Sequence, residues 1–205
     1  IKYLFKEISN LDNKVYRTII SLFKPGFLTS EWNKGRLIRY IHPIKLFTFL
    51  SISYFFIPND LITIINETGL NFTGNLSFLN DKILHAKITK ILCIPLESII
   101  LILFFRKSEF YYVNHLIYCI HCTSFTLLIT LISRPLMYYG LTTWSLVSLE
   151  TLFFLLINIF YRIFAFKKVY KKNFFKSFII SNISWILPNL LLNMFLALFS
   201  TNGFV

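Results

Sequence analysis

The sequence predicts an all-α polytopic integral membrane protein, in which five transmembrane helices follow an amphipathic cytoplasmic segment. Three observations predict this class: 56 % of the 205 residues are hydrophobic, long apolar runs recur along the chain, and lysines and arginines gather in alternate breaks between those runs. A water-soluble domain could not bury so much apolar surface, whereas lipid can cover it. The basic breaks fit the excess of Lys and Arg that borders the cytoplasmic side of membrane spans.

Residues 1–43 form the predicted cytoplasmic segment. Apolar side chains recur there at steps of three and four, the stripe of an amphipathic helix, at Leu4, Ile8, Leu11, Val15, Ile19 and Leu22. Pro25 and Gly26 end this helix, and a second short helix is predicted from Leu28 to Asn33. A basic helix of this kind rests in the headgroup layer, where each Lys or Arg gains about 1 kcal/mol beside anionic lipid, or it docks on a partner protein.

Residues 44–205 form the predicted transmembrane domain. A helix needs about 20 residues to cross the ~30 Å hydrocarbon layer. The last three apolar runs meet that length, whereas Pro58, Asn59 and Asp60 interrupt the first run and the second needs its outer turn to reach it. The five predicted spans are residues 44–65, 87–105, 112–133, 141–165 and 178–199.

The charges orient these spans. The segment before the first span is basic, and the break between the fourth and fifth spans contains five lysines and no acid. The breaks after the first and third spans carry few cations. The positive-inside rule therefore predicts a cytoplasmic N-terminus and an extracytoplasmic C-terminus. The formal charge of +12 does not indicate a nucleic-acid partner, because the cations flank the spans and do not cover one soluble face.

Short matches to a known pattern run through most of the chain. One group precedes the first span and comprises Tyr16-Arg17-Thr18, the run from Phe23 to Gly26, Gly35-Arg36, Arg39-Tyr40 and Pro43. Another group lies in the later spans and comprises Pro95, Tyr112, His115, Tyr118, His121, Phe125 and residues 162–170. In these features the chain resembles an uncharacterised family of bacterial multi-pass membrane proteins, whose members often begin with a four-cysteine zinc ribbon that is absent before Cys93. The resemblance implies a multi-pass protein of the bacterial inner membrane and supplies no activity.

Ionisable residues at membrane depth are costly and are candidate functional groups. Glu97, His121 and Glu150 each lie near the middle of a predicted span. Two carboxylates and an imidazole could relay protons or hold a cation, because shared protons lower the charge that must be buried. The alternative, which we favour, is that the two carboxylates are protonated or paired and only fasten helices together.

Two residues of the third span are weak candidates for metal or haem ligands. His115 and Cys119 share a helical face, but His121 points about 120° away from His115. Cys122 lies about 10 Å along the helix axis from His115, too far for both to bind one ion. We therefore predict no cofactor, and a metal or haem carrier is the least favoured function.

The last span carries a polar stripe that predicts a helix-contact face, because amides facing lipid would lack hydrogen-bond partners. Its members are spaced by seven, four and seven residues: Asn182, Asn189, Asn193 and Ser200. Interfacial or partner-docking positions are predicted at the cytoplasmic side, at Arg36, Arg39, Tyr40, Lys167, Lys168, Lys171 and Lys172.

The sequence contains no phosphate-binding loop, dinucleotide-binding turn, nucleophile elbow or zinc-protease motif. We therefore predict that the protein is not an enzyme. The favoured function is a non-catalytic accessory or structural subunit of an inner-membrane protein complex, with anionic lipid and other membrane subunits as partners. The alternative is a small transporter or proton conduit.

Overall fold

The computed structural model describes the chain outside residues 1–12, 37, 57–75, 107–109, 141–143 and 202–205. Side chains are described outside three further stretches, 76–86, 134–151 and 196–201. All regular secondary structure in the described residues is helical, which confirms the all-α class.

Residues 13–22 are helical, and six further helices are bounded in the described chain. These are α2 (Phe27–Asn33), α3 (Pro43–Phe56), α5 (Leu76–Phe104), α6 (Tyr112–Gly140), α7 (Trp144–Tyr170) and α8 (Phe174–Thr201). Helices α5 to α8 contain 27 to 29 residues each, so each is about 40 Å long. The short helix predicted over residues 28–33 is confirmed as α2.

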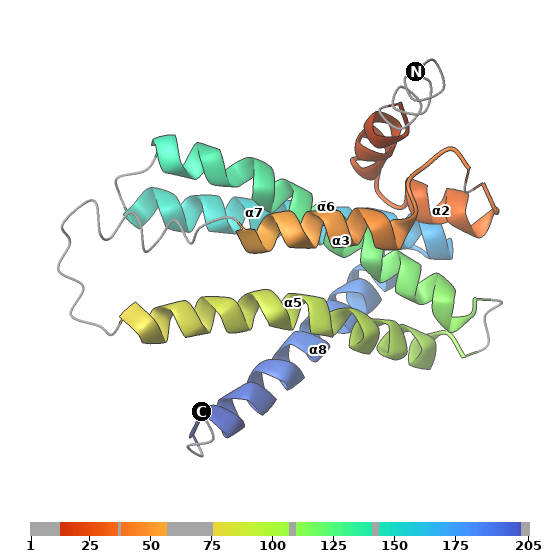
Figure 1. Ribbon diagram of the computed structural model, residues 1–205. Helices are drawn as coiled ribbons and strands as arrows, with labels where there is room; N and C mark the ends of the chain where they lie inside the picture. Colours follow the sequence, from red (N-terminus) through yellow and green to blue (C-terminus); the bar gives the residue numbers. More distant parts are fainter. Residues whose placement is uncertain (1–12, 37, 57–75, 107–109, 141–143, 202–205) are drawn as a thin grey trace.

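Helix α6 occupies the centre of the bundle. It contacts α2, α3, α5 and α7, whereas α8 packs against α5 and α7. Figure 1 shows α3, α6 and α7 running together and α8, in blue, slanting away toward the C-terminus. The N-terminal segment is attached to this bundle, because α2 contacts both α6 and α7.

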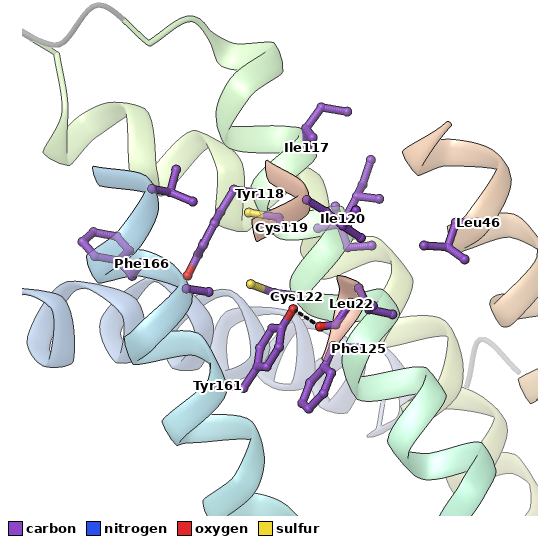
Figure 2. Packing of buried hydrophobic residues seen from close by; sticks show 14 of the residues in the cluster. Leu22, Leu46, Ile117, Tyr118, Cys119, Ile120, Cys122, Phe125, Tyr161 and Phe166 are labelled. Atoms are coloured by element: carbon purple, nitrogen blue, oxygen red, sulfur yellow. Dashed lines mark hydrogen bonds between the residues drawn. The ribbon is translucent and has the colours of Figure 1, made fainter. Parts of the chain in front are cut away.

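A hydrogen bond from a stacked tyrosine joins the end of the helical residues 13–22 to the bundle. The rings of Phe125 on α6 and Tyr161 on α7 are stacked with their centroids 3.6 Å apart. The Tyr161 hydroxyl donates a hydrogen bond of 2.8 Å to the carbonyl oxygen of Leu22, drawn as a dashed line in Figure 2. Of the predicted apolar stripe, Leu22 is buried in the core together with residues of α6 and α7, whereas Val15 is 39 % exposed.

A glycine allows the chain to approach α7 closely before α2 begins. Gly26 precedes α2 with a φ of 67°, a left-handed conformation that disfavours residues with a Cβ atom. A Cβ at this position would lie 2.7 Å from the carbonyl oxygen of Ala165. The predicted end of the first helix at Pro25 and Gly26 therefore also sets how closely α2 packs on α7.

By length and composition, two of the described helices are apolar enough to cross a membrane. They are Tyr112–Ser133 in α6 and Phe174–Phe195 in α8, at the third and fifth predicted spans. A core helix of a soluble protein passes the same test, and 61 % of the α6 segment is buried in this chain. Only 17 % of the α8 segment is buried. Helix α3 is apolar but has 14 residues, and the rest of the first predicted span lies outside the described residues.

Candidate functional site

A buried ion pair joins the middle of α5 to α7. Glu97 and Arg162 are 2 % and 4 % exposed. The Arg162 guanidinium approaches both carboxylate oxygens, with Nη1 donating to Oε1 and Nη2 donating to Oε2 at 3.4 Å. The planar guanidinium matches a carboxylate in this two-point geometry. Because each charge would be costly to bury alone, the pair holds the two helices in one register.

Two aromatic residues extend this ion pair to the remaining long helices. The Trp185 ring on α8 lies 5.3 Å from Cζ of Arg162, within the range of a cation–π interaction. The Tyr118 hydroxyl on α6 donates to the carbonyl oxygen of Arg162 over 3.3 Å. Arg162 Nε is buried without a hydrogen-bond partner in the described part of the chain. Thus α5, α6, α7 and α8 all meet around Arg162.

Sequence reasoning included Glu97 as a candidate but missed Arg162. Arg162 was grouped with the basic segment 162–170, although it lies inside the predicted span 141–165. A single cation inside one span and a single carboxylate inside another were the signal that could have paired them. Helix register alone does not show that two such residues face each other.

The predicted cluster of Glu97, His121 and Glu150 is only partly described. His121 on α6 shares a hydrogen bond of 2.9 Å between its Nδ1 and Oγ1 of Thr29 on α2, and both residues are buried. Among the described residues, no hydrogen bond or ion pair joins Glu97 to His121. The Glu150 side chain lies outside the described residues.

His121 also lines a pocket of about 100 Å³ at the α2 end of the bundle. The lining combines aromatic rings, a guanidinium and aliphatic groups, from Leu28, Trp32, Arg36, Tyr40, Ile41, His42 and Pro43. The Trp32 and His42 rings meet edge to face with their centroids 5.1 Å apart. This pocket is a small, mostly apolar space, with two imidazoles and one guanidinium in its lining.

The weak metal candidate His115 lies in an aromatic environment. Its Nδ1 is 2.7 Å from the Tyr170 hydroxyl, and its Nε2 is buried without a partner in the described chain. Burial raises the pKa of Tyr170, so this hydroxyl remains protonated and can donate to His115. Cys119 is fully buried. No group of three or more His, Cys, Asp and Glu residues within the described structure is placed to hold a metal ion.

The polar stripe of α8 makes no interhelical hydrogen bond among its described members. The amide nitrogens of Asn182 and Asn189 donate to the carbonyl oxygens of Phe178 and Trp185 in the same helix. Asn193 is exposed. The Ser200 side chain lies outside the described residues.

The predicted docking positions gather where α2 and the end of α7 meet. Nζ of Lys168 lies 5.0 Å from the centre of the Phe27 ring, and Tyr40 packs against the same ring. Arg36 Nη1 lies 3.5 Å from a carboxylate oxygen of the buried Glu31. The other four positions are exposed cations: Arg39, Lys167, Lys171 and Lys172.

A model of the family described as "Protein of unknown function (DUF3667)" matches residues 12–55. The matched segment is less than a quarter of the chain and includes the helical residues 13–22, α2 and nearly all of α3. It supplies Thr29 and every residue of the pocket lining except His121. No curated protein and no solved structure matches the chain.

Proposed function

We propose that this chain is a five-span protein of the bacterial inner membrane, with a cytoplasmic N-terminus, and that it acts as a non-catalytic structural subunit of a membrane protein complex. The resemblance to bacterial multi-pass proteins and the charge distribution support the location and the orientation. The end of α7 contacts α2 through Lys168 and Phe27. The basic N-terminal segment and the lysine-rich break after the fourth predicted span therefore lie at the same end of the bundle, as the positive-inside rule requires.

The distribution of apolar side chains supports membrane insertion. In the described structure, more large apolar side chains are exposed than are buried. They are dense on the second half of α8, where Leu190, Leu191, Met194 and Phe195 are each 54 to 63 % exposed. Such a continuous apolar surface on a soluble monomer would be an aggregation liability, whereas lipid or a partner helix covers it without cost.

The buried charges support a structural role over a proton conduit. The Glu97 carboxylate is paired with the Arg162 guanidinium on α7, and the His121 imidazole is hydrogen-bonded to Thr29 on α2. A carboxylate held by a guanidinium is a poor proton carrier, because protonating it would leave the guanidinium as an uncompensated buried charge. Both contacts instead join helices that are distant in the sequence.

The observation that carries the subunit proposal is the exposed amide of Asn193. This side chain projects from α8 among exposed apolar neighbours, and nothing in the described structure hydrogen-bonds it. An amide in contact with hydrocarbon alone loses the hydrogen bonds that it makes in water. A second membrane helix with a polar side chain at this height would restore them.

The proposal is tested by purifying the tagged full-length chain from its native membrane in mild detergent and identifying stoichiometric companions by mass spectrometry after size exclusion. We expect a membrane protein partner that Asn193→Trp depletes several-fold. Leu191→Trp is the matched control, because residue 191 is exposed on the same part of α8 but about 160° around the helix from residue 193. A homogeneous species without partners would contradict the subunit proposal and favour the proton conduit.

A further inference from the structure

A second pocket lies between the start of the helical residues 13–22 and residues 38–39. It has a volume of about 220 Å³ and is lined by Asn13, Lys14, Arg17, Ile38 and Arg39. The three cations are exposed. None of them forms a salt bridge with a carboxylate in the described part of the chain. Within the described residues, the pocket therefore concentrates positive charge that no carboxylate pairs with.

One buried threonine holds the two walls of this pocket together. The Thr18 hydroxyl donates to the carbonyl oxygen of Lys14 over 2.6 Å and accepts the backbone N–H of Ile41 over 3.0 Å. Thr18 has no exposed surface. The helical wall and the wall formed by residues 38–41 are thus fixed relative to each other, so the spacing of the cations is built into the fold.

The pocket borders an apolar surface suited to the headgroup region of a bilayer. In Figure 1 the helical residues 13–22, in red, run across the direction of α3 and α5. A helix that crosses the spans in this way lies along the membrane plane. Its Tyr16 and Ile20 are 66 % and 41 % exposed, and their spacing of four residues places them on one face. Ile38 is 85 % exposed at the pocket itself.

We propose that this pocket binds the phosphate of an anionic phospholipid headgroup in the cytoplasmic leaflet. The guanidinium groups of Arg17 and Arg39 and the Lys14 ammonium would pair with phosphate oxygens, which are strong acceptors for these donors. The Asn13 amide is placed to bind the polar part of the headgroup, while Ile38 enters the acyl boundary. This inference rests on the membrane location proposed above and assigns the lipid class and the residues that select it.

The experiment uses the full chain purified in mild detergent and titrated with phosphatidylglycerol or phosphatidylcholine, with bound lipid counted by native mass spectrometry. We expect one phosphatidylglycerol to be retained and no phosphatidylcholine to be retained at matched concentration. The triple variant Lys14→Gln, Arg17→Gln, Arg39→Gln should bind phosphatidylglycerol roughly 10-fold or more weakly, because each cation contributes several-fold to the affinity. The matched control removes three exposed cations outside the pocket, Lys45, Arg106 and Lys176, and should keep the lipid.

Three other results would overturn the lipid site, and a fourth would contradict the proposed membrane location instead. Equal losses in the two triple variants would overturn the site, because they would indicate diffuse electrostatic attraction. Displacement of the lipid by equimolar inorganic phosphate would overturn the lipid as ligand and indicate a soluble phosphate compound. If the triple variant is not recovered folded, Lys14→Gln and Arg39→Gln are tested singly, and full retention of lipid by both overturns the site. A chain that stays in solution without detergent would instead contradict the proposed membrane function.

Discussion

Helices α6 and α8 have similar lengths and both carry a segment apolar enough to cross a membrane, yet they have opposite surroundings. The α6 segment is 61 % buried within the chain, and the α8 segment is 17 % buried. Hydropathy therefore identifies helices that avoid water but does not tell whether protein or lipid covers them. In α6 the buried side includes His115, His121 and Ser124. In α8 the exposed side is almost wholly aliphatic and aromatic.

The largest expected effect comes from breaking the buried pair around which the bundle is assembled. We expect Arg162→Met to lower the free energy of unfolding in detergent by about 3 to 5 kcal/mol, because Glu97 is left as an uncompensated buried charge. The double variant Glu97→Leu, Arg162→Met should recover most of this loss, since apolar side chains of similar size replace both charges. Chemical unfolding in mixed micelles measures both values, and equal losses in the single and double variants would contradict the pairing.

A pair of truncations tests the contrast between α6 and α8 directly. Phe125→Ala removes a ring stacked on Tyr161 and should cost about 3 kcal/mol of stability, as large-to-small changes in packed cores do. Leu191→Ala removes a side chain that is 56 % exposed and should cost less than about 1 kcal/mol in the isolated chain. Thermal unfolding of the two variants in one detergent is the measurement. Similar losses would show that α8 is packed as tightly as α6.

The close approach of the chain to α7 gives a smaller effect with a matched control. Gly26→Ala should destabilise the protein by about 2 to 3 kcal/mol, because it combines a left-handed φ with a Cβ that meets Ala165. Gly35→Ala has a similar φ of 73° but open space around the added carbon, so we expect about 1 kcal/mol. Unfolding curves that coincide for the two variants would contradict the packing of α2 on α7.

The smallest expected effect concerns the hydrogen bond between α2 and α6. Thr29→Val keeps the shape of the side chain but leaves Nδ1 of the buried His121 without its partner, which should cost about 1 kcal/mol. Ser30→Ala is the control, because the Ser30 hydroxyl donates to Phe27 within the same turn and its loss should be nearly neutral. Equal stabilities of the two variants would contradict a structural role for the Thr29 to His121 bond.

The periodicity of apolar residues predicted where several helices lie better than where they end: α5 begins at Leu76, well before the predicted span 87–105. Residues 28–33, 112–133 and 178–199 were placed on helices that the structure contains as α2, α6 and α8. Pro25 and Gly26 marked the turn before α2 because both residues disfavour a continuing helix. Local chemistry dictates such boundaries, so the sequence alone reveals them.

The partners of the polar side chains were harder to predict, because they depend on which helix faces meet. Glu97 was recognised as a buried carboxylate, but its partner lies 65 residues later in the chain. His121 was assigned to a mid-membrane cluster, whereas its hydrogen-bond partner Thr29 lies in the segment predicted to be interfacial. Contacts between distant residues depend on how each helix is rotated, and a helix that is apolar on all sides has no polar face to define that rotation.

The most direct test of the central claim, that lipid covers α8 while protein covers α6, is electron paramagnetic resonance of the reconstituted full chain. Single spin labels are placed at Ile186, Leu190 and Met194, all exposed on α8, and their collision rates with oxygen and with a water-soluble nickel complex are compared. We predict high accessibility to oxygen and low accessibility to nickel at all three positions, because oxygen partitions into hydrocarbon and the complex does not. High accessibility to nickel along this face would place α8 in water and contradict the account.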